Sequence, residues 1–200
     1  MPKPQRDAVR TRALLLAAAG RCIATRGASV SLDVIAREAG VSKGGLLHHF
    51  PTREDLLLAL MQDLLDQFTA AVDRELERER AALSPSEPAP AGTLVRAYVR
   101  AVFADLEDGD RAREQVTLMG MIGSSPAVTE FVRTDDETWA ARLASDGLDP
   151  LRAAVITNAA DGVTGSLLWS RKEPESYRAL QETLIALTYN AGPLDVAPSV

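Results

Sequence analysis

The sequence has one cysteine, two histidines and no long apolar run. Because Cys22 is the only cysteine among 200 residues, an intrachain disulfide is excluded and a reducing compartment is indicated. No apolar stretch approaches the roughly 18 residues of a membrane span, and "ALLLAAAG" is broken at once by Arg21, unlike the core of a signal peptide. With 46% hydrophobic residues the chain can bury a core. This composition predicts a soluble, cytoplasmic protein.

The net charge of −6 is unevenly distributed along the chain. Residues 1–53 hold nine basic and three acidic side chains, a net charge of +6, whereas the remaining residues hold 13 basic and 25 acidic side chains, a net charge of −12. A basic segment on an acidic body indicates a polyanionic partner at one end of the molecule. Random variation of surface charge is the alternative.

Apolar periodicity predicts an all-α protein of about nine helices. Val9, Ala13, Leu16, Gly20 and Ile23 form one stripe, which predicts a first helix over about residues 7–25. Further helices are predicted over about residues 31–40, 42–50, 52–82, 93–107, 111–122, 127–145, 150–171 and 175–189. The loop "SPSEPAPAG" separates the fourth helix from the fifth, and no strand pattern or internal repeat is visible.

Two short helices joined by the tight turn "AGVS" occupy residues 31–50, which is typical of a helix-turn-helix. Ser31 and Ser42 are placed to cap these helices. Ile35 and Ala39, like Leu46 and Phe50, lie one turn apart and can face inward. The opposite face of the second helix then presents Ser42, Lys43, Gly44, Leu47 and His48.

The segment "VSKGGLLHHF" begins its helix with two glycines, although Gly in a helix costs about 1 kcal/mol relative to Ala. A recognition helix enters the major groove with its N-terminal residues nearest the bases, and glycine lets the backbone approach closely. Lys43 can reach a guanine edge or a phosphate. The alternative is a tight helical corner that needs glycine for packing.

His48 and His49 are the only histidines in the chain. Adjacent helical residues point about 100° apart, so these two rings are poorly placed to share a metal ion. No third ligand of the usual kind accompanies them. We therefore expect a hydrogen bond to phosphate or an ordinary surface position.

The stretch "SLDVIAREAGVSKGGLLHHFPTREDLLLAL", Ser31 to Leu60, closely resembles the DNA-binding domain of the TetR family of transcriptional regulators. The likeness extends back through "RTRALLLAAAGRCIATRGAS". It implies a DNA-binding domain over residues 1–53, and over residues 54–200 a variable helical domain for ligand binding and dimerisation. The residues that the resemblance places near DNA are Ser31, Ser42, Lys43, Gly44, Gly45, Leu47, His48, His49 and Arg53. Leu47 departs from the tyrosine of many members and offers apolar contact, as to a thymine methyl.

The resemblance also implies a homodimer on palindromic operator DNA, paired through the last two long helices. Small residues Ala160, Gly162 and Gly165 would allow close approach of those helices. An apolar or amphipathic small molecule would act through the long fourth helix, which touches both domains. Bulky candidates for its pocket are Phe103, Met119, Met121, Trp139 and Trp169, although such residues more often form core.

No cofactor, metal site or catalytic residue is expected from the sequence. Two other classes of function are considered beside a ligand-released repressor. One is a helix-turn-helix regulator without a small ligand, acting as an activator or controlled by a protein partner. The other is a helical enzyme, for which we find no nucleophile and base or metal cluster in the sequence.

Overall fold

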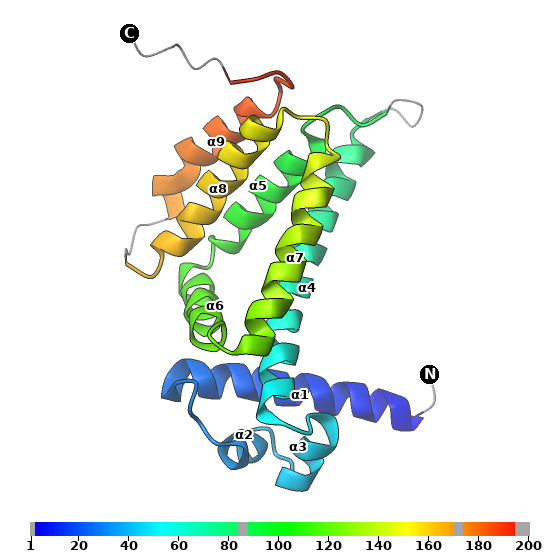
Figure 1. Cartoon of the computed structure of the whole chain (residues 1–200), viewed down its shortest axis with the longest axis vertical. Helices are drawn as coiled ribbons and strands as arrows, with labels where there is room; N and C mark the ends of the chain where they lie inside the picture. The colour runs from blue at the N-terminus through cyan, green and yellow to red at the C-terminus, as the bar shows by residue number, and fades with distance from the viewer. Residues whose placement is uncertain (1–2, 84–87, 170–173, 195–200) are drawn as a thin grey trace. The chain divides into compact units, whose positions relative to one another are not determined.

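The computed structural model describes residues 3–83, 88–169 and 174–194. Within these ranges the regular structure is helical throughout, which confirms the all-α prediction. The helices are α1 Lys3–Arg26, α2 Leu32–Glu38, α3 Lys43–His49, α4 Arg53–Ala81, α5 Thr93–Asp105, α6 Gly109–Ile122, α7 Pro126–Ala144, α8 Pro150–Ser166, the 3-10 helix η1 Pro174–Tyr177, and α9 Arg178–Leu187 (Figure 1). None of these helices is long and apolar enough to cross a membrane.

The chain packs as two compact units. The first holds residues 1–65 and 117–134, and the second holds residues 66–116 and 135–200. Helices α4, α6 and α7 each contribute residues to both units. The predicted end of the DNA-binding domain at residue 53 concerns function rather than packing. These two units do not test it, and it stays a prediction.

The buried face of α1 differs from the predicted apolar stripe. Val9 is 58% exposed and Ala13 is also exposed, so the first half of that stripe was wrong. Burial on α1 begins at Leu15 and continues through residues such as Cys22 and Ile23. Only the C-terminal half of α1 packs against the core of the first unit, so the N-terminal half stays exposed.

The short helices α2 and α3 are built as the sequence predicts, and Figure 1 shows them as two single short coils connected by a tight turn. The Ser31 hydroxyl accepts a bond from Val34 N at 3.4 Å, and the Ser42 hydroxyl accepts one from Gly45 N at 3.0 Å. Gly40 adopts φ +71°, a left-handed conformation that favours glycine, at the end of α2. Ile35, Leu46 and Phe50 are buried, and Ala39 packs partly against them.

Helix α5 lies at the centre of the second unit, packed against α8 and α9. Two buried arginines fix the end of α9. Arg96, on α5, donates to the Thr188 hydroxyl at 3.1 Å. Arg152, on α8, donates to the backbone carbonyls of Leu187, Gly192 and Pro193 at 3.1, 2.6 and 2.8 Å. Both guanidinium groups therefore replace water with carbonyl and hydroxyl oxygens.

The last two predicted helices differ from the structure at their ends. Helix α8 ends at Ser166 rather than near residue 171, and Arg171 lies outside the described residues. The α-helical part of the last helix begins at Arg178 instead of Glu175, because the preceding turn is the tighter 3-10 helix that often precedes an α-helix.

Candidate functional site

The residues predicted to approach DNA lie on α3, on the cap of α2 and at the start of α4, all within the first unit. Ser31, Ser42, Lys43, Gly44 and His48 are exposed. The others are half-buried: Gly45, Leu47, His49 and Arg53. None of the nine is buried, and their contact with DNA stays a prediction.

The two glycines of α3 are not required by packing inside the protein. A Cβ added at Gly44 would meet the Ser42 hydroxyl at 3.9 Å, and one added at Gly45 would meet the same atom at 3.4 Å. Both separations are ordinary contacts, and neither glycine has a positive φ. This segment is therefore not crowded enough for packing to require glycine. Gly44 is exposed, so the backbone of the first turn is accessible to a second molecule there.

Lys43 is paired with an acidic side chain of the neighbouring helix. Its Nζ lies 2.8 Å from Oδ2 of Asp33, and each side chain is about half exposed, at 54% and 55%. This pair joins the first turn of α2 to the first residue of α3. It alters the electrostatics of the predicted surface, because the lysine charge is locally balanced by a carboxylate.

Arg53 holds the loop that precedes α2. Its Nη1 donates to the Val30 carbonyl at 2.6 Å, and its Nη2 donates to the Ala28 carbonyl. These carbonyls belong to the loop between α1 and Ser31, so Arg53 connects the start of α4 to the entry of α2. The phosphate contact that the sequence suggested for Arg53 stays a prediction. It would have to be made by a guanidinium that already donates hydrogen bonds to two carbonyls.

The two histidines follow on the same helix. Their rings are 5.6 Å apart between centroids and nearly perpendicular. Among the described residues, no group of three His, Cys, Asp or Glu side chains is placed to hold a metal ion.

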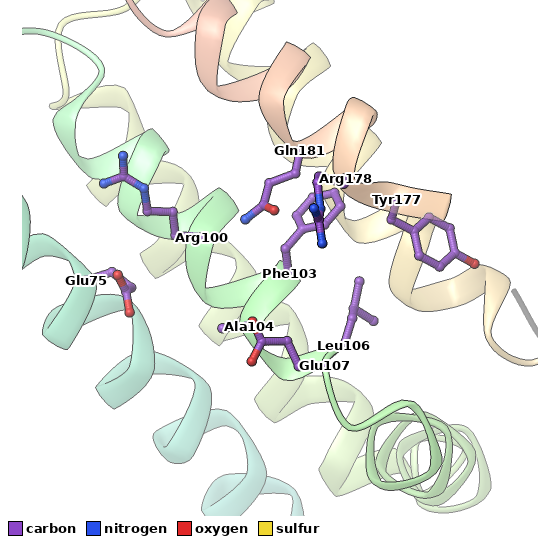
Figure 2. A pocket seen from close by; sticks show the side chains of 9 residues that line it. All are labelled: Glu75, Arg100, Phe103, Ala104, Leu106, Glu107, Tyr177, Arg178 and Gln181. Carbon is purple, nitrogen blue, oxygen red and sulfur yellow. The ribbon is translucent and has the colours of Figure 1, made fainter. Parts of the chain in front are cut away.

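Phe103 lines a cavity of about 460 Å³ in the second unit. Figure 2 shows that α4, α5 and α9 all contribute to its wall, with the Phe103 ring between the helices. The polar and charged wall residues are Glu75, Arg100, Glu107, Arg178 and Gln181. Leu106 and Tyr177, both buried, add apolar surface, so the lining mixes apolar side chains with polar and charged ones.

Trp139 belongs to a cluster of three aromatic rings with Phe68 and Tyr98. The ring centroids are 5.2 to 5.8 Å apart and the rings meet edge to face or tilted. The Tyr98 hydroxyl donates to Oδ1 of Asp161 at 2.7 Å. Burial, followed by the neighbouring Asp161 carboxylate, raises the pKa of Tyr98 above its usual range, and burial also raises the pKa of Asp161 despite the bond from Tyr98.

The other candidates for the ligand pocket lie elsewhere. Met119 and Met121 are half-buried and pack against the core of the first unit. Trp169 is 89% exposed and belongs to neither core. The five candidates therefore do not form one wall within a single unit.

Helices α8 and α9 carry exposed apolar side chains on their outer faces. Leu151 is 59% exposed, Val155 is 42% exposed and Leu180 is 36% exposed. Gly162 and Gly165 are exposed with open space around them, as close helix approach requires. Ala160, in contrast, is fully buried in the second unit, so its place in a dimer interface is excluded.

Comparison with known proteins matches both parts of the chain. Residues 15–60 match the family model described as bacterial regulatory proteins, tetR family, and residues 92–189 match the tetracyclin repressor-like C-terminal domain. The HTH-type transcriptional regulator BetI of Rhizobium meliloti (strain 1021) is 31% identical over 195 residues, spanning 94% of this chain and 90% of that protein. The chain belongs to the TetR family.

Solved structures agree with the fold of this TetR-family chain. The multidrug binding protein EbrR complexed with malachite green has a TM-score of 0.67 and 24% identity, covering 92% of this chain and 98% of that one. AibR in complex with isovaleryl coenzyme A and operator DNA has a TM-score of 0.62 and 20% identity, covering 90% and 98%. The family identifies the chain as a DNA-binding transcriptional regulator and not an enzyme.

Two contacts in this TetR-family regulator were missed by sequence reasoning. Asp33 is ten positions from Lys43, beyond the spacing of any helical pair, and only the geometry of the turn brings them together. Phe68 and Tyr98 come from separate helices, so no local pattern predicts their contact with Trp139.

Proposed function

We propose that this regulator is a cytoplasmic, homodimeric repressor that leaves a palindromic operator when a small apolar or amphipathic molecule binds its second unit. The observation that carries the proposal is the exposed, serine-capped α3, with two glycines that nothing inside the protein requires. Such a helix start presents an exposed backbone surface to the major groove. Its residues from Ser42 to His49, with Ser31 and Arg53 beside them, form the proposed DNA contact.

Pairing through α8 and α9 is supported by the apolar side chains that these helices leave exposed. Leu151 and Val155 are one turn apart on α8, and Leu180 lies on α9. Exposed apolar groups of this kind mark association surfaces when they are contiguous. A two-fold dimer would place two copies of α3 on successive half-sites of one operator.

An organic effector is supported by the apolar and aromatic surfaces of the second unit. Phe103 and Leu106 line the cavity beside charged side chains such as Arg100, a mixture that suits an amphipathic molecule. The related folds EbrR and AibR are complexed with malachite green and isovaleryl coenzyme A respectively, two different organic molecules. Trp139 and its aromatic neighbours Phe68 and Tyr98 are further proposed contacts in the second unit.

The proposed route from ligand to DNA is α4. This helix has 29 residues, belongs to both units, and begins with Arg53, which donates to the loop before α2. A ligand that favours one position of α4 over another would therefore change the placement of α2 and α3.

Selection of bound sequences from random duplex DNA, followed by salt titration on the winner, tests the proposal. We expect a palindromic motif whose affinity falls steeply with salt. Weak binding to all duplexes, with no enriched motif, would contradict it. A thermal-shift screen against mixed metabolites and drugs then separates ligand control from the alternative, a regulator governed by a protein partner, for which no compound raises Tm.

A further inference from the structure

We propose that Asp33 is a specificity-determining residue, which restrains Lys43 and weakens binding to non-specific DNA more than binding to the operator. This inference rests on the proposed contact of α3 with DNA. Its basis is the ion pair of 2.8 Å between the first turn of α2 and the first residue of α3.

Lys43 is the main mobile cation of the proposed DNA contact. Only two of its nine residues are lysine or arginine, and Arg53 is held by the carbonyls of Val30 and Ala28. The Lys43 side chain is long and 54% exposed, so without a partner its ammonium could occupy many positions around the start of α3. In that state it could meet a phosphate on any duplex.

The carboxylate of Asp33 limits this freedom. An ammonium has three N–H donors, so a bond to Asp33 leaves two donors for DNA, in directions fixed by the turn between α2 and α3. A base edge met by α3 in its docked register can still be reached. An arbitrary phosphate requires the lysine to leave its partner, and it also brings the Asp33 charge towards the polyanion.

The two kinds of DNA should therefore respond differently to removal of the Asp33 charge. Non-specific affinity comes almost entirely from phosphate contacts and counterion release. Operator affinity also includes base contacts, which the restrained lysine already makes. An exposed ion pair of this kind changes an equilibrium by about 1.4- to 5-fold.

The test compares Asp33→Asn, Lys43→Ala and the double variant by fluorescence anisotropy in a salt series. The probes are the duplex selected from the random pool and a scrambled duplex of equal length and composition. Glu38→Gln is the matched control, since it removes one charge from the same helix, where Glu38 pairs with Arg21 at 3.6 Å. Circular dichroism and Tm establish that each variant is folded, and Asp33→Ser replaces the asparagine variant if that one fails to fold.

For Asp33→Asn we expect affinity for the scrambled duplex to rise about 2- to 5-fold per protomer, and operator affinity to change less than about 2-fold. The slope of log K against log salt on the scrambled duplex should steepen by about 0.9 per protomer. In the Lys43→Ala background, Asp33→Asn should change neither affinity, and Glu38→Gln should leave the specificity ratio unaltered.

Equal tightening on both duplexes, no change on either, or the same gain in the Lys43→Ala background would overturn the inference. A different result identifies failure of the proposed function itself. If Lys43→Ala alters binding to neither duplex, α3 does not dock as proposed, and the role of Asp33 fails with it.

Discussion

Arg53→Ala should destabilise the first unit by removing the connection between α4 and the loop before α2. The guanidinium makes two hydrogen bonds to backbone carbonyls, those of Val30 and Ala28. Bonds that involve a charged group contribute about 1.5–3 kcal/mol each, but Arg53 is only half-buried, so water replaces part of that energy. A loss of about 2 kcal/mol in the free energy of unfolding is expected, equivalent to a fall in Tm of about 4–8 °C for a chain of this size.

The assay is thermal unfolding followed by circular dichroism, with Arg53→Lys as the control. Lysine keeps the positive charge, yet a single ammonium cannot span both carbonyls, so we expect it to recover less than half of the lost Tm. Operator binding is then measured as a function of salt at a temperature where every variant is folded. A Tm that stays within about 1 °C of the wild type, together with a salt slope shallower by about 0.9 per protomer, would refute the structural role and favour a phosphate contact instead.

Three other variants test the second unit and the shared helices. Gly92→Ala should lower Tm by several degrees, because Gly92 has φ +84° and a Cβ there would lie 2.3 Å from the Thr188 carbonyl oxygen. Gly120→Ala, at an open helical position, is the control and should leave Tm unchanged or raise it. Asp161→Asn should flatten the pH dependence of Tm. Burial raises the folded-state pKa of Asp161 above its ordinary 3.8, so the wild type loses stability as pH rises from 3.8 through the folded-state pKa. A variant with the same pH profile of Tm as the wild type would contradict this. Val155→Glu should convert the proposed dimer to a monomer in analytical ultracentrifugation with little change in helicity. A variant that stays dimeric would exclude this part of α8 from the interface.

Local sequence signals predicted the helix-turn-helix well because its determinants are local. The hydroxyls of Ser31 and Ser42 reach amides only three residues away, and Gly40 supplies the left-handed conformation at the end of α2. The same reasoning failed for Val9 at the start of α1. Periodicity shows which residues share a face, but it does not show how far along the helix the neighbouring elements extend.

The residues of the second unit were harder to predict because helical periodicity is the same for core and for a ligand wall. Phe103 and Trp139 were both reasonable candidates. Phe103 is buried beside a cavity, and Trp139 is partly buried within an aromatic cluster. Trp169 had the same chemical character but is 89% exposed. Its position follows α8, where the helix ends earlier than the sequence indicated.

The sequence by itself determined the helical class, the serine caps of α2 and α3, the excess of basic charge in the first quarter of the chain, and the resemblance to the TetR family. Each of these depends on composition or on residues within a few positions of one another. Only the tertiary structure decided that Arg53 donates to the loop carbonyls, that Lys43 is paired with Asp33, and that Ala160 is core. Those facts depend on which helices meet and at what separation, and distances across a turn or between helices are not encoded in any local spacing.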